Sequence, residues 1–179
     1  FVDGSCMYMA PGQSSARAGW AIVEVSEESD LMAAYYGPLP PEYPQTAQAA
    51  EQYVLLMAVR MLIGHETIYS DCEGVVDGFT KGKQRSVRPE SFHADIWDFI
   101  WDTLEDSYGI NVYKVEAHKP EEACKGDPWQ LWLRKGNVAA DGYAKAGTRR
   151  HPGKMFDLEP QKANVATVKL VQVWLAQAN

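Results

Sequence analysis

Four acidic residues in a fixed order constrain the possible fold of this chain most strongly. They are Asp3, Glu51, Asp71 and Asp141. The first ends an apolar strand before a predicted Gly–Ser turn, and the second lies inside a predicted helix over residues 46–63. The third ends a strand over 67–70, and the fourth opens a last helix over 137–146. Grouped carboxylates repel one another, so divalent cations are the usual reason to gather them. Hard oxygen ligands of this kind suit Mg²⁺ or Mn²⁺.

Hydrophobic periodicity predicts one mixed α/β domain around these acids. A polar turn between two β-prone runs predicts a hairpin, and Thr46 is a predicted N-cap. The predicted strands cover the first residues and 17–25, 31–36, 67–70 and 111–115; the predicted helices cover 46–63, 73–79, 92–104 and 137–146. The order βββαβααβα predicts a mixed five-stranded sheet flanked by helices.

Composition agrees with a single domain inside the cell. A chain of 179 residues with 46% hydrophobic content can bury one sizeable core. The sequence has no apolar run of membrane-spanning length. Its three cysteines show no C-x-x-C spacing, which favours a reducing compartment, cytoplasmic or nuclear, over a disulfide framework or a thiolate metal site. Because Phe1 begins in mid-strand, we expect the chain to be a fragment of a longer polypeptide.

Five segments in order resemble motifs of the type 1 ribonuclease H family. They are Asp3-Gly4-Ser5, Thr46-Ala47-Gln48-Ala49-Ala50-Glu51, Tyr69-Ser70-Asp71-Cys72, Val115-Glu116-Ala117-His118 and Asn137-Val138-Ala139-Ala140-Asp141-Gly142-Tyr143-Ala144. The resemblance implies a ribonuclease H-like α/β fold with a catalytic domain over residues 1–147. Residues 148–179 are then expected to form a linker and an appended helix, whose apolar spacing is clearest over residues 163–176.

The same resemblance implies a metal-dependent endonuclease that hydrolyses the RNA strand of RNA–DNA hybrids. Asp3 would bridge two Mg²⁺ ions, for which Mn²⁺ can substitute. Glu51 and Asp71 would complete one ion site, and Asp141 the other. Two ions roughly 4 Å apart can activate water and stabilise the leaving oxygen. Substrate contacts are implied for Gly4, Ser5, Cys6, Gln48, Cys72 and Asn137. Contacts to RNA 2′-hydroxyls are what distinguish RNA from DNA.

Several features depart from the family pattern. Ala47 and Ala49 replace a usual Asn and Arg, so we expect weaker affinity for the hybrid or weaker strand discrimination. Residues 119–140 lack the mobile histidine of many relatives, so we expect slow product release. A net charge of −7 is unusual for a protein that binds a polyanion. Basic residues do gather at 81–88, which is read either as a basic protrusion or as a solvated loop.

Individual residues also have ordinary structural readings. Asp141, near a predicted helix start, can serve the helix dipole instead of a metal. Trp129 and Trp132, in the predicted loop before the last helix, can stack on nucleic acid but more often serve packing. The remaining histidines, His65, His93 and His151, are read as surface or packing residues.

Other function classes stay open. One is a catalytically weak or inactive binding or scaffold domain within a larger polymerase polyprotein. Another is an integrase or exonuclease of the same fold superfamily, although Glu51 and the Asp-Gly-Ser motif favour ribonuclease H. The divergent helix motif favours a retroelement polyprotein, where an adjacent reverse transcriptase domain would hold the hybrid, over a stand-alone enzyme.

Overall fold

A mixed five-stranded sheet forms the centre of the molecule, as the element order predicts. The computed structural model describes residues 1–8, 16–62, 64–105 and 109–151. The strands are β1 (Val2–Tyr8), β2 (Ala16–Val25), β3 (Leu31–Pro38), β4 (Thr67–Ser70) and β5 (Asn111–Lys114). They lie in the order β3-β2-β1-β4-β5. The first three are antiparallel, whereas β4 and β5 run parallel to β1. The central strand β1 therefore carries Asp3 into the middle of the sheet.

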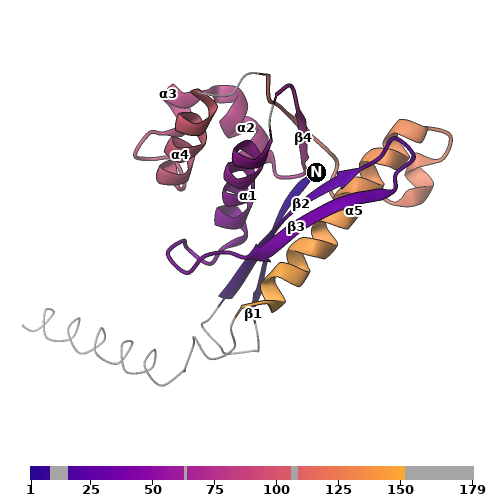
Figure 1. The fold of residues 1–179 in the computed structure, drawn as a ribbon, viewed down its shortest axis with the longest axis horizontal. Coiled ribbons are helices and arrows are strands. Elements are labelled where there is room, and N and C mark those ends of the chain that lie inside the picture. Colours follow the sequence, from indigo (N-terminus) through magenta and orange to yellow (C-terminus); the bar gives the residue numbers. More distant parts are fainter. Residues whose placement is uncertain (9–15, 63, 106–108, 152–179) are drawn as a thin grey trace, which may run out of the picture.

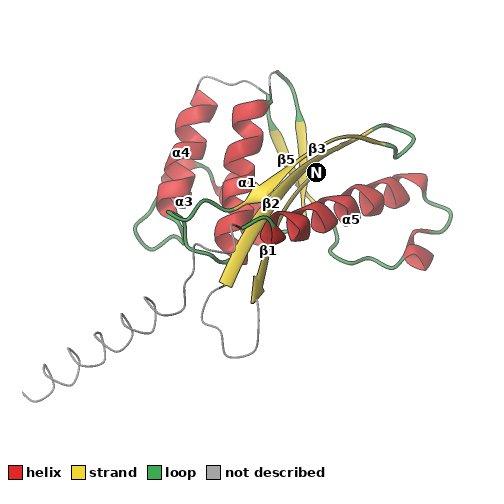
Figure 2. Cartoon of the chain, turned by 60° about the horizontal axis from the view of Figure 1, so that its bottom comes forward, coloured by secondary structure: helices red, strands yellow, loops and turns green. Residues whose placement is uncertain are grey.

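Helices cover both faces of this sheet (Figure 1 and Figure 2). They are α1 (Ala47–Met61), α2 (Glu73–Lys81), α3 (Lys83–Ser86), α4 (Ala94–Glu105) and α5 (Pro128–Arg149), with a 3₁₀ turn, η1 (Glu121–Cys124). On one face α1 and α4 bury the main core, and on the other α5 packs over a smaller one. The two apolar layers hold the sheet rigid between them and so fix the strand ends that carry the acids.

Helix α1 begins as predicted. The hydroxyl of Thr46 accepts a hydrogen bond of 3.1 Å from the N–H of Ala49, which satisfies one free donor of the first turn. Nine residues of the helix are buried, and Glu51 is among them. The amphipathic stripe thus turns this one carboxylate toward the sheet instead of solvent.

The predicted turn after Asp3 is wrong, because β1 continues through Tyr8 and pairs with β2 along its whole length. Gly4 is needed for a different reason. A Cβ built on Gly4 would lie 2.3 Å from the backbone nitrogen of Glu51. The missing side chain therefore lets α1 approach β1 closely, which places Glu51 beside Asp3.

Helix α5 begins at Pro128, nine positions before the predicted start. Asp127 caps it by accepting a hydrogen bond of 3.1 Å from the N–H of Gln130. Trp129 and Trp132 consequently lie in the first turns of this helix, not in a loop. Asp141 lies in its middle, so the helix-dipole reading fails, since that effect is confined to the terminal turn.

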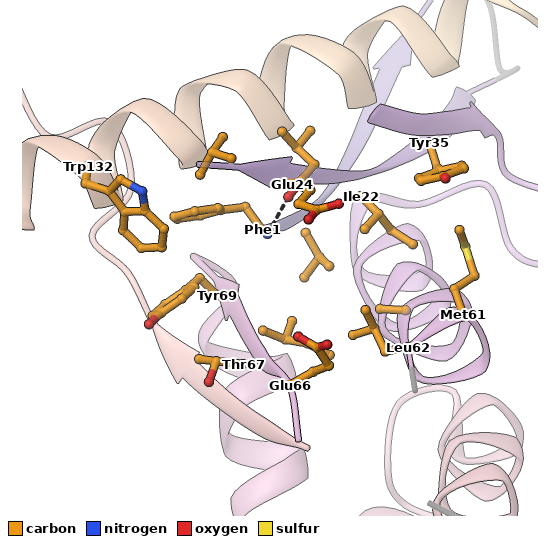
Figure 3. A pocket seen from close by; sticks show the side chains of 15 residues that line it. Phe1, Ile22, Glu24, Tyr35, Met61, Leu62, Glu66, Thr67, Tyr69 and Trp132 are labelled. Atoms are coloured by element: carbon orange, nitrogen blue, oxygen red, sulfur yellow. Dashed lines mark hydrogen bonds between the residues drawn. The ribbon is translucent and has the colours of Figure 1, made fainter. Parts of the chain in front are cut away.

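A cavity of about 440 Å³ lies between β2, β4 and the end of α1 (Figure 3). Apolar side chains such as Ile22 and Leu62 line it together with Glu24 and Glu66. None of the four singled-out acids lines it, so the chemistry expected from those acids belongs elsewhere. No described helix is long and apolar enough to cross a membrane. The predicted appended helix over 163–176 lies outside the described residues, and the division at residue 147 stays a prediction.

Candidate metal centre

Three of the predicted carboxylates converge at one point. Oxygen atoms of Asp3, Glu51 and Asp71 all lie within 4.8 Å of one another. The register explains two of them, because Val2 pairs with Ser70 across the parallel strands β1 and β4, so Asp3 and Asp71 follow side by side. The third comes from α1 across the close contact at Gly4. Strand pairing and helix packing together make the cluster.

Burial and mutual repulsion make the cluster reluctant to ionise. Asp3 is 5% exposed and Glu51 is 8% exposed. Burial, followed by the charges of Asp71 and Asp141, raises the pKa of Asp3 to about 8, while Lys145 opposes that shift. Burial and then the charge of Asp3 raise the pKa of Glu51 well above its usual range. Both carboxyl groups are therefore costly to ionise unless a positive charge lies close to them.

The donor set fits a divalent cation. Oε2 of Glu51 is buried and has no hydrogen-bond partner among the described residues. The backbone N–H of Gly4 only partly opposes the upward shift of the Glu51 pKa. A buried carboxylate oxygen with no partner costs free energy. A hard cation bound by the three converging carboxylates would satisfy that oxygen. The residues therefore suit Mg²⁺ or Mn²⁺ better than a soft metal.

Asp141 lies outside this close group. Its Oδ2 forms an ion pair of 2.7 Å with Nζ of Lys145, which lies one helical turn further along α5. Its charge nevertheless reaches Asp3, whose pKa it raises. The structure thus places Asp141 at the rim of the centre, engaged with a lysine.

Asn137 reaches the centre from α5, although the resemblance assigns it to substrate. Its side-chain amide donates a hydrogen bond of 2.9 Å to Oδ2 of Asp71. The residue is buried, and its own Oδ1 has no partner among the described residues. Asn137 therefore orients Asp71.

The other predicted substrate residues lie on the elements that meet here. Gly4, Ser5 and Cys6 belong to β1, and the Cys6 thiol donates to the carbonyl of Gln45 at 3.5 Å. Gln48 is exposed in the first turn of α1. Cys72 caps α2, and burial raises the pKa of its thiol. Of these residues, Gly4 packs against the backbone of Glu51, and Cys72 directly follows Asp71 in the chain.

Two lysines beside the centre were not among the predicted site residues. Lys114 ends β5, and its Nζ donates to the backbone carbonyl of Asp71 at 2.6 Å and to that of Val115 at 2.8 Å. Its charge lowers the pKa of Glu51. Lys145 pairs with Asp141. The i, i+4 spacing of Asp141 and Lys145 was a usable signal. For Lys114 the signal was its place at a strand end beside the end of β4.

The predicted basic run at 81–88 is partly neutralised within the domain. Lys81 pairs with Asp77, and Lys83 pairs with both Asp102 and Glu105. Arg85 is exposed, as is Arg88. The run forms the end of α2 and the short helix α3, so it is not a simple loop.

The two tryptophans of α5 differ in exposure. The indole of Trp132 donates to the carbonyl of Ser26 at 2.7 Å and packs against Phe1, with the ring centroids 4.9 Å apart. Trp129 stacks on Trp132 but stays 52% exposed. Packing therefore accounts for Trp132, while Trp129 presents an aromatic surface. His151 is buried and contacts the carbonyl of Ala18 at 2.7 Å, as its packing reading expected.

Comparison with known proteins gives a family and several similar structures. The family model described as RNase H matches residues 1–149. The solution structure of the PFV RNase H domain is similar with a TM-score of 0.65 and 22% identity, covering 83% of this chain and 92% of that one. The native prototype foamy virus protease–reverse transcriptase gives a TM-score of 0.65 and 20% identity, covering 83% of this chain. This chain spans only 20% of that protein's length.

A third similar structure is the foamy viral protease–reverse transcriptase in complex with RNA/DNA hybrid. Its TM-score is 0.58 at 21% identity, covering 82% of this chain and 19% of that chain. A search of curated proteins finds no match. At these identities the similar structures show the fold.

Proposed function

The chain belongs to the RNase H family, and on that premise we propose that it is a metal-dependent endonuclease for the RNA strand of RNA–DNA hybrids. The observation that carries this proposal is the convergence of Asp3, Glu51 and Asp71 within 4.8 Å, with a buried oxygen of Glu51 unpartnered among the described residues. A fold alone does not determine an activity, so the proposal rests on this site.

The carboxylates are proposed to divide between two cations. Asp3, Glu51 and Asp71 would hold one, and Asp3 with Asp141 would hold the other. When bound, such ions provide a Lewis acid for the phosphate and lower the pKa of a coordinated water. Mg²⁺ and Mn²⁺ are the proposed ions, because both accept hard oxygen ligands.

The remaining residues of the centre position these groups. Asn137 holds Asp71 through the hydrogen bond at 2.9 Å, and the close approach of Gly4 to α1 places Glu51 beside Asp3. Fixed carboxylates keep the attacked phosphodiester in one orientation, which lowers the entropic part of the barrier. Cleavage of the P–O3′ bond by water leaves a 3′-hydroxyl and a 5′-phosphate.

Recognition of the hybrid is proposed to use the surface beside the centre. Gln48 is exposed at the start of α1, and Ser5 and Cys6 lie on β1. Gly4 brings these two elements together. Polar groups at this place would contact 2′-hydroxyls across the minor groove, which supports a preference for RNA.

An adjacent reverse transcriptase domain is the proposed partner. The net charge is −7, and Lys81 and Lys83 are already paired with acids of the domain. Phosphate contacts by Lys and Arg supply much of the affinity for nucleic acid, so this domain alone should hold a hybrid weakly. A neighbouring domain that binds the hybrid would supply the missing affinity.

Cleavage of a strand-labelled RNA–DNA hybrid with Mg²⁺ or Mn²⁺ tests the proposal. The wild type should cut only the RNA strand, and Asp71→Asn should abolish cutting while keeping the fold by circular dichroism. Asp77→Asn is the matched control, because Asp77 is an exposed acid on α2 away from the cluster. If a folded wild type binds hybrid but never cuts it with either ion, the domain is a scaffold or needs its partner domain for cleavage.

A further inference from the structure

Lys145 lies on the side of the centre where a second cation is proposed. Its Nζ is 2.7 Å from Oδ2 of Asp141, and the two residues are one turn apart on α5. The Lys145 side chain is 45% exposed and that of Asp141 is 26% exposed. Lys145 also acts on Asp3, because its charge opposes the upward shift of the Asp3 pKa. The ammonium of Lys145 therefore interacts with Asp141 and with Asp3, the two carboxylates that the second ion would need.

A metal ion and this ammonium compete for the charge of Asp141. The carboxylate is a weaker ligand for a divalent cation while Nζ of Lys145 lies 2.7 Å from its Oδ2, because the ammonium already offsets its negative charge. A bound ion would also be repelled by the nearby positive charge. In the part of the chain that the structure describes, no lysine contacts a side-chain oxygen of Asp3, Glu51 or Asp71, since Lys114 donates to backbone carbonyls.

We propose that Lys145 is a built-in counter-cation for Asp141, which the second metal ion must displace. The inference rests on the proposed function and deepens it. Two ions then bind in order: the first at Asp3, Glu51 and Asp71, and the second more weakly, after the Asp141–Lys145 pair opens. A partly exposed pair one helical turn apart is weak enough to open.

The chain offers a matched control for this lysine. Lys81 pairs with Asp77 at 2.9 Å with the same i, i+4 spacing, on α2. Lys145→Met removes the charge at the centre, and Lys81→Met removes an equivalent charge elsewhere. Lys145→Arg keeps the charge and provides a conservative substitution.

Calorimetric titration with Mn²⁺, together with counting of bound Mn²⁺ by electron paramagnetic resonance, tests the proposal without any nuclease assay. In Lys145→Met the second ion should bind about three- to tenfold more tightly than in the wild type. Lys81→Met and Lys145→Arg should bind as the wild type does. Adding Asp141→Asn to Lys145→Met should remove the second binding step. Circular dichroism would verify that each variant is folded.

The outcomes separate this inference from the proposed function. If Lys145→Met binds the second ion no more tightly than the wild type, or binds one ion only, the counter-cation role is wrong while the metal centre stands. If the folded wild type binds no Mn²⁺, or binds it no better than Asp71→Asn does, the proposed metal centre is wrong. The counter-cation role then fails with it.

Discussion

The side-chain amide of Asn137, on α5, donates a hydrogen bond of 2.9 Å to Oδ2 of Asp71 at the end of β4. These residues are 66 positions apart in sequence. The contact ties the last helix to the strand end that supplies one member of the carboxylate group. Asp71 is therefore held in place by the helix that also carries Asp141.

Asn137→Ala should lower the rate of hybrid cleavage about tenfold, as is usual for groups that orient metal ligands. Without the hydrogen bond from Asn137 the Asp71 carboxylate would no longer be held in one orientation. The affinity for Mn²⁺ should therefore fall as well. Steady-state kinetics and Mn²⁺ titration measure the two effects. Asn111→Ala, at an exposed position on β5, is the control and should leave both unchanged. Equal cleavage and Mn²⁺ binding by Asn137→Ala and the wild type would show that Asn137 does not orient the ligand.

Gly4→Ala should destabilise the domain by about 1–3 kcal/mol, because the added Cβ would collide with α1. Its nearest atom would be the backbone nitrogen of Glu51, at 2.3 Å, which cannot move aside as a flexible side chain would. Gly142→Ala is the contrasting control, since no atom of the described residues lies within 4 Å of a Cβ there. In the interior of α5 it should stabilise by about 0.5–1 kcal/mol. Urea unfolding measures the free energy of unfolding of both variants. If Gly4→Ala leaves that free energy unchanged, the close packing of α1 on β1 is contradicted.

Without divalent ions, the stability of the domain should fall as the pH rises from about 4 to about 8. The reason is that the pKa of Asp3 is raised to about 8 in the folded chain from an ordinary value of 3.8. The folded state binds more protons than the unfolded state over that interval, so unfolding becomes easier as those protons leave.

The comparison with Asp3→Asn isolates this effect from other titrating groups. Melting curves in a chelating buffer at pH 5 and pH 8 should show a larger loss of Tm for the wild type than for the variant. Adding Mg²⁺ at pH 8 should raise the Tm of the wild type by binding the folded state. Parallel pH profiles for the two proteins would contradict a raised pKa at Asp3.

Arg85→Ala should weaken hybrid binding and reduce the slope of log affinity against log salt by about one. Arg85 is exposed on α3, next to Lys83, whose ammonium is occupied by Asp102 and Glu105. Lys83→Ala should therefore change the salt slope less. Binding assays over a range of salt concentrations compare the two. If the two variants have equal effects, the ion pairs of Lys83 do not limit its contact with phosphate.

Local patterns determined most of the elements. The apolar stripe and the Thr46 cap predicted α1, and the β-prone runs predicted the antiparallel strands. The order of elements predicted the mixed five-stranded sheet. The motifs around Asp3, Glu51 and Asp71 identified the three acids that converge. Each of these features is encoded by residues near one another in the chain, which is why the sequence alone determined them.

Contacts between distant segments decided the rest. Strand β1 continues past Gly4 because β2 pairs with it and α1 needs the space of a missing side chain. The early start of α5 is stabilised by packing of Trp132 on Phe1, and a Cβ on Gly136 would lie 2.2 Å from the Phe1 ring. Local sequence does not record such long-range packing.

The metal centre also depends partly on the sequence and partly on the tertiary structure. The sequence by itself determined which carboxylates a divalent ion would need, because residue type sets the chemistry of the ligand. Only the tertiary structure decided that Asn137 orients Asp71 and that Lys114 contacts the backbone carbonyl of Asp71. The physical reason is that charge interactions depend on the distance between side chains. Strand register and helix packing set that distance for Asn137 and Lys114, whereas Asp141 and Lys145 meet because they are one helical turn apart in the sequence of α5.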